Sequence, residues 1–236
     1  MLGRTTMAES QTAEQVLEHQ KEVLGEEFGL QFYALHNDLV WLYTRWFQFK
    51  QLFSTNEKRI ELMNQTAPSF FRMLQLTLWE NIILNIARLV DSRKSVGKEN
   101  LTLQWLPSHL TVPIKQSELQ TLVNAAIEAA SFAKDWRHRN IAHRDLSLAM
   151  KRPVEPLESV NTVKVERALK AIQDVLSWVH KEYFDTQFAY EFANLSGGAE
   201  VLLSHLREGL EARKQRFDRI ESGIATQADY DLRGAP

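Results

Sequence analysis

The feature that most constrains the fold is the recurrence of apolar residues with the period of an α-helix. From residue 28 to residue 53 they fall at alternating steps of four and three, which places them on one helical face: Phe28, Phe32, Leu35, Leu39, Leu42, Trp46, Phe49 and Phe53. The period-two alternation of strands is almost absent, and only 9 Gly and 6 Pro punctuate the chain. We therefore predict one all-α domain of about six to seven helices.

Helix boundaries follow from capping residues and prolines. We predict helices over about 8–24, from residue 28 and from Pro68, and a short turn or helix at 101–107 that Pro107 stops. A further helix starts near residues 116–117 and ends before Pro153, and Asn161 or Thr162 caps the next one. A charged amphipathic helix over about 199–220 precedes a frayed tail. The predicted division is 1–25, 26–190 and 191–236.

Composition bounds the function classes. The 44% of hydrophobic residues suffices for a core, and the net charge of -2 means that any nucleic-acid contact depends on a local patch. With no cysteine, a disulfide scaffold, a thiol nucleophile and thiolate metal sites are excluded. The N-terminus lacks the apolar core of a secretory signal, and no run of apolar residues is long enough for a membrane span. We expect a cytoplasmic protein that does not associate with membranes.

One segment gathers cationic and titratable side chains. Residues 137–144 hold three arginines, two histidines and an asparagine: Arg137, His138, Arg139, Asn140, His143 and Arg144. A basic loop at 88–98 adds Arg88, Arg93, Lys94 and Lys98 against the single acid Asp91. If the two segments pack together, they form a cationic pocket suited to phosphate groups.

Two interpretations of this cluster remain open from periodicity alone. His143 shares a face with Ala133 and Trp136, so it points toward a helix–helix seam, where a side chain with an ordinary pKa of about 6.5 can transfer protons. Alternatively, His143 is a hydrogen-bonded core residue and the arginines are ion-paired on the surface. His138 and His143 cannot jointly bind one metal ion from a single helix, so we expect no metal site. A stripe of polar residues lies on the preceding long helix: Thr77, Asn81, Asn85, Arg88 and Ser92. This stripe is either a solvated edge of the helix or the lining of a cleft.

The segment from Arg137 to His143 resembles the R-x(4–6)-H signature of the HEPN superfamily (higher eukaryotes and prokaryotes nucleotide-binding domain). The order of "LWENIILNIARLVDSRK", "ENLTLQWL" and "DWRHRNIAHRDL" is similar to the abortive-infection AbiU-type branch, over roughly residues 30 to 185. The resemblance implies an antiparallel helical bundle that forms a homodimer through the motif-bearing helix. It also implies a metal-independent endoribonuclease without cofactors, whose active site combines Arg and His from both protomers.

Carried onto this chain, the resemblance implies a role for each residue of the cluster. His143 would be the acid/base group, Arg137 would stabilise charge on the phosphate, and His138 would orient or polarise. RNA-binding residues would be Arg139, Asn140, Arg144, Arg88, Arg93 and Lys94. Arg139 shares the face of His143 and competes with Arg137 for the catalytic role.

Two questions stay open: how Arg137 and His143 come together, and whether the protein is catalytic. Arg137 and His143 lie about 120° apart around an ideal helix, so either a second protomer supplies one of them or the helix is locally broken. As an effector, the protein would be an RNA-cutting toxin or antiviral protein, restrained by an antitoxin or another defence-system partner. The alternative is a non-catalytic HEPN-like module that binds RNA, a nucleotide or a protein.

Overall fold

The computed structural model describes residues 12–54, 56–95, 97–141, 150, 158–190 and 197–230. Their secondary structure is helical apart from one antiparallel hairpin of two-residue strands, β1 (Lys94–Ser95) and β2 (Lys98–Glu99). The prediction of an all-α fold is confirmed. Within this described part, no helix combines the length and the apolar character needed to cross a bilayer.

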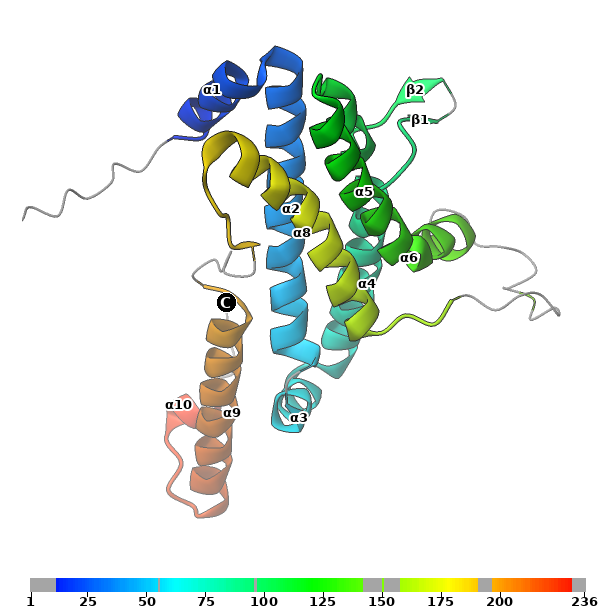
Figure 1. Cartoon of the computed structure of the whole chain (residues 1–236). Coiled ribbons are helices and arrows are strands. Elements are labelled where there is room, and N and C mark those ends of the chain that lie inside the picture. The colour runs from blue at the N-terminus through cyan, green and yellow to red at the C-terminus, as the bar shows by residue number, and fades with distance from the viewer. Residues whose placement is uncertain are drawn as a thin grey trace, which may run out of the picture. The chain divides into compact units, whose positions relative to one another are not determined.

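The described residues divide into two compact units, which we call the main unit (12–43 and 80–190) and the second unit (44–79 and 197–230). The helices α2 and α4 contribute to both. The helices of the described residues are α1 (Ala13–Leu24), α2 (Glu26–Phe53), α3 (Glu57–Thr66), α4 (Pro68–Leu89), η1 (Leu103–His109), α5 (Pro113–Ala129), α6 (Ser131–Trp136), η2 (Arg137–Ile141), α8 (Thr162–Phe184), α9 (Ala199–Glu221) and α10 (Gln227–Tyr230) (Figure 1).

The core of the main unit is made by the apolar stripes that the sequence predicts. Along α2, Phe32, Leu35 and Leu39 are fully buried. Helix α5 packs along α8 (Figure 1). The stripe of α8 is buried as well: Val165, Ala168, Leu169, Ile172, Val175, Leu176 and Val179. Each stripe repeats every three to four residues, because only that spacing keeps side chains on one helical face.

Local signals set most helix ends. Thr12 and Gln15 form a reciprocal capping box at the start of α1, and the side chain of Asn161 accepts a hydrogen bond from the backbone of Lys164 at the start of α8. Pro68 is the first residue of α4, as predicted. At Gly29 a Cβ atom would lie 2.6 Å from the Cα of Lys21, so the close approach of α2 to α1 requires glycine there.

Several elements differ from the prediction: no helix was predicted at α3, and α1 begins at Ala13 rather than near residue 8. Pro107 lies inside η1, a 3₁₀ helix, rather than ending the segment, and α5 begins at Pro113, three residues before the predicted start. The long helix that we predicted to continue through the cationic cluster breaks at Ala130. Part of the C-terminal tail is helical, because an ion pair between Asp229 and Arg219 holds α10 to α9. The hydrogen bond from the Arg219 guanidinium lowers the pKa of the Asp229 carboxyl. Sequence periodicity carries no information on such long-range pairing.

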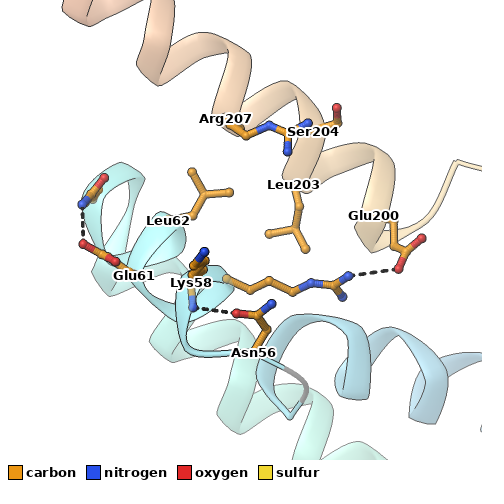
Figure 2. A pocket seen from close by; sticks show the side chains of 10 residues that line it. Asn56, Lys58, Glu61, Leu62, Glu200, Leu203, Ser204 and Arg207 are labelled. Atoms are coloured by element: carbon orange, nitrogen blue, oxygen red, sulfur yellow. Dashed lines mark hydrogen bonds and ion pairs between the residues drawn. The ribbon is translucent and has the colours of Figure 1, made fainter.

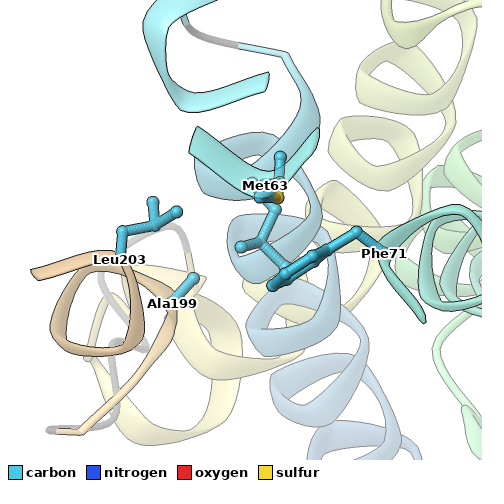
Figure 3. Close-up of a cluster of buried hydrophobic side chains, with 5 residues drawn as sticks. Met63, Phe71, Ala199 and Leu203 are labelled. Carbon is cyan, nitrogen blue, oxygen red and sulfur yellow. The ribbon is translucent and has the colours of Figure 1, made fainter. Parts of the chain in front are cut away.

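The second unit has its own small core. Met63 of α3, Phe71 of α4 and Leu203 of α9 meet there, together with Leu52 and Ala199 (Figure 3). The residues of this cluster are at most 7% exposed. The first two turns of α9 are therefore anchored on α3 by apolar packing.

Two histidines contact each other in the main unit, His180, which is buried, and His36, which is half-buried. His36 Nδ1 lies 2.8 Å from the hydroxyl of Tyr190 and 3.2 Å from His180 Nε2. The ring of Phe188 packs edge-on against His36, with the ring centroids 4.6 Å apart. Burial lowers the pKa of both histidines from 6.5 to about 4, and for His36 the neighbouring His180 adds to the effect.

This histidine pair predicts acid sensitivity. Because folding disfavours the protonated rings, the unfolded chain binds more protons between pH 6.5 and 4, so stability is full above this window and falls as the pH falls through it. We expect the free energy of unfolding to drop by about 2–4 kcal/mol across the window. Urea titrations at a series of pH values measure the free energy of unfolding across this window. His180→Gln should flatten the profile, with the exposed His205→Gln as the matched control; an unchanged profile in His180→Gln would contradict the assignment.

Candidate functional site

The cationic cluster begins where the helix changes its geometry. After α6 the backbone continues as η2, a π-helical turn over Arg137–Ile141. Such turns are rare and widen the helix by one residue per turn, which alters the direction of the side chains that follow. The structure therefore departs from a regular α-helix within the predicted motif. His143 and Arg144 lie outside the described residues, so their predicted roles stay predictions.

Arg137 pairs with a carboxylate from a distant part of the chain. Its Nη1 lies 2.5 Å from Oδ2 of Asp91, which follows the end of α4, and the two side chains are 26% and 19% exposed. A guanidinium carries five N–H groups in a rigid fork. The contact with Asp91 can thus orient the group while other donors face an anion. It also joins the basic loop to the motif segment.

The backbone of Asp91 is itself held in place. The single hydroxyl proton of Thr102, a fully buried residue, is shared between the carbonyls of Leu89 and Asp91, whose oxygens lie 3.0 and 2.8 Å from Oγ1. The side-chain amide of Gln104 donates to the carbonyls of Val90 and Asp91. These bonds satisfy carbonyls at the end of α4 that lack helical partners. The segment before and within η1 therefore braces the carboxylate that orients Arg137.

Sequence reasoning did not select Asp91 as a site residue. Its only signal was its position as the single acid in the basic run from Arg88 to Lys98. Its partner lies 46 residues away, and only the fold brings the two together.

The competing arginine has a local partner. Arg139 Nη1 lies 3.4 Å from Oδ1 of Asp135, one helical turn earlier. The other oxygen of Asp135 accepts the backbone N–H of Glu158, and the indole of Trp136 donates to the carbonyl of Glu158. Asp135 and Trp136 thereby hold the segment that leads into α8 against α6. A pair four residues apart on a helix is worth only tenths of a kcal/mol, so the interaction with Asp135 constrains Arg139 weakly.

The remaining candidates differ in how firmly they are held. In the basic loop, the Nε of Arg93 donates to the carbonyl of Gln104 at 2.7 Å, and its guanidinium lies 5.0 Å from the centre of the Trp105 ring. Lys94 pairs with Glu99 across the hairpin at 3.3 Å. Arg88 is exposed and contacts Asn85 at 3.5 Å. Arg93 thus already supports the loop structure.

Two motif residues and the polar stripe complete the site. Within the motif, His138 is exposed and Asn140 is half-buried. In the stripe of α4, the amide of Asn85 donates to the backbone carbonyl of Asn81 at 2.7 Å. Asn81 and Asn85 are half-buried, whereas Arg88 and Ser92 are exposed. The stripe therefore reaches solvent at the end of α4, beside Asp91.

One of the comparisons with known proteins identifies the family of the chain. The family model HEPN_AbiU2, described as AbiU2, matches residues 25–200, which include α2 to α8 and thus Asp91 and Arg137. Comparison with curated proteins and with solved structures yields no match. Since the family model covers most of the sequence, the chain belongs to the HEPN superfamily, in its AbiU2 branch.

Proposed function

We propose that this protein is a metal-independent endoribonuclease of the abortive-infection type, active as a homodimer. The observation that carries the proposal is the Asp91–Arg137 pair at the π-helical turn, within the segment that the family model matches. A half-buried arginine oriented by a braced carboxylate suits a phosphate that gains charge during the reaction.

The chemistry requires proton transfer and charge stabilisation. The 2′-hydroxyl of RNA attacks the adjacent phosphorus, the bond from phosphorus to the 5′-oxygen breaks, and the products are a 2′,3′-cyclic phosphate and a 5′-hydroxyl. His143 would take the proton from the 2′-hydroxyl, and a proton would be returned to the leaving 5′-oxygen. His138 would orient or polarise the reacting groups. Arg137 would neutralise the phosphate oxygens in the transition state. DNA lacks the nucleophile and should remain intact.

In the proposed dimer the two motif segments face each other across the interface. Each active site then combines Arg137 of one protomer with His143 of the other. Arg139, Asn140, Arg144, Arg88, Arg93 and Lys94 would contact the RNA backbone. A neutralising partner protein would restrain the activity until it is needed.

The test is cleavage of a labelled single-stranded RNA in excess EDTA. We expect the parent chain to cut the RNA and to leave 2′,3′-cyclic phosphate ends, and His143→Ala to lower the rate by about 10²–10⁴-fold because the proton-transfer group is lost. The exposed His205→Ala is the matched control and should cut like the parent. A DNA of the same sequence should be inert. Cleavage that EDTA abolishes, or equal rates for the parent and His143→Ala, would refute the proposal.

A second function is favoured by one feature of the site. Both candidates for the catalytic arginine already have a carboxylate partner, Asp91 for Arg137 and Asp135 for Arg139. A site whose cations are compensated in this way also suits a non-catalytic module that binds RNA, a nucleotide or a protein. In that case the parent and His143→Ala would bind RNA equally and neither would release products.

A further inference from the structure

A groove follows α9 in the second unit. Between α3 and α9 lies a cavity of about 750 Å³, which Figure 2 shows from close by, with Leu62 and Leu203 among its lining residues. A second cavity of about 640 Å³ lies farther along α9 and shares Leu62, Gln65 and Arg207 with the first. We call the two together the α3–α9 groove. The comparison that places the chain in its family ends at residue 200, so α9 lies almost entirely beyond the match.

The apolar lining of the groove repeats every seven residues. Leu203, Leu210 and Phe217 follow one another at this spacing along α9. A seven-residue apolar repeat is the pattern by which one helix packs along another. α3 has 10 residues and α9 has 23, and the row passes from Leu203, which is 7% exposed, to Phe217, which is 47% exposed. The last part of the seam is therefore open to solvent.

The rim of the groove carries cations without acidic partners. Lys58, Arg207 and Lys214 line it, and among the described residues none of the three takes part in an ion pair. Arg207 and Lys214 are themselves seven residues apart, so they flank the apolar row at consecutive repeats. Flanking charges at these positions select the partner of a helix–helix seam.

The acids of the groove are already engaged. Glu200 pairs with Arg59 at 3.1 Å, Glu61 accepts a hydrogen bond from Gln65, and Glu211 accepts one from Gln215. The lining holds five cations against these three acids, so its net charge is positive: Lys58, Arg59, Arg207, Arg213 and Lys214. A polyanion such as RNA could pair with these cations, but its phosphates would find no partner in the apolar row of Leu210 and Phe217. A helix with an apolar row and acidic flanks matches both the row and the rim.

We propose that the α3–α9 groove binds an acidic amphipathic helix of a partner protein. Apolar side chains of that helix pack between Leu62, Leu210 and Phe217, and its carboxylates pair with Lys58, Arg207 and Lys214. This is the helix-in-groove mode of recognition, with apolar anchors for affinity and charge for selectivity. The proposal is independent of the ribonuclease proposal, since none of these residues belongs to the motif segment.

The probe is a fluorescein-labelled synthetic helix with leucine at the a and d positions of its heptads and glutamate at e and g. Fluorescence anisotropy with the full chain should give saturable binding with a micromolar Kd. Lys214→Glu and Arg207→Glu should each weaken it by about tenfold, because a rim charge pair becomes a repulsion. Arg72→Glu reverses an exposed charge of the same unit outside the groove and is the matched control, expected to bind like the parent. Hydrogen exchange should show protection in α3 and α9 when the peptide is added.

Several outcomes would overturn the proposal. The first is absence of saturable binding, and the second is equal binding of a peptide with lysine in place of every glutamate. An equal loss of affinity in Arg72→Glu would mean that only net charge matters. Displacement of the peptide by short RNA at comparable concentration would assign the groove to nucleic acid. If Leu210→Glu instead converts a dimer into a monomer in light scattering, the groove is filled by a second copy.

Discussion

Replacing Arg137 with alanine is expected to lower the rate of RNA cleavage by about 10²–10³-fold, because the transition state loses its oriented guanidinium. Asp91→Asn should give a smaller loss, since it removes the group that orients Arg137 and leaves the cation in place. The double variant should be no slower than Arg137→Ala alone, because both substitutions affect one unit. Single-turnover rates with labelled RNA measure all three.

Two comparisons make this prediction decisive. Arg139→Ala should retain most of the activity; if it is the inactive variant and Arg137→Ala is not, the catalytic arginine has been assigned wrongly. Mixing inactive Arg137→Ala with inactive His143→Ala should restore activity, since a mixed dimer contains one site with both intact groups. Failure of the mixture to recover would place both groups of a site on one protomer.

The largest effect on stability is expected at Phe32, which is fully buried in α2. Phe32→Ala should lower the free energy of unfolding of the main unit by about 3–5 kcal/mol, through lost burial and the cavity left behind. The ring also packs against His180, with the centroids 5.0 Å apart, and against Phe184 at 6.0 Å. Urea denaturation followed by circular dichroism measures the change.

Trp41 provides the matched control, because it is an aromatic residue of the same helix that is 53% exposed. Trp41→Ala should change the free energy of unfolding by less than about 0.5 kcal/mol. A similar loss in both variants would mean that the exposed face of α2 is covered in solution.

Local sequence patterns determined most of the long helices and the family, whereas α3 and α10 were not predicted. The stripes of α2 and α8 could be predicted because burial of one helical face imposes a period that no other structure shares. Asn161 and Pro68 marked helix starts because their effects act on backbone groups within one turn. The motif from Arg137 to His143, in the order of segments around it, was sufficient to indicate the HEPN superfamily, which the family comparison confirms.

The structure around the motif could not be predicted from these patterns. Continuous periodicity suggested one long helix, whereas the backbone breaks at Ala130 and widens at Arg137, since packing against neighbouring segments outweighs small differences in helix propensity. A tail that appeared frayed contains α10, because Arg219 and Asp229 attract each other.

What the sequence by itself determined is therefore the helical class, the main core faces and the candidate motif, all of which depend on neighbours within a turn or two. What only the tertiary structure decided is which charges meet. Asp91 and Arg137 are 46 residues apart, and their pairing depends on Thr102 and Gln104 holding the end of α4. The open seam along α9 was equally unpredictable, because the extent to which α3 covers it depends on how the helices pack.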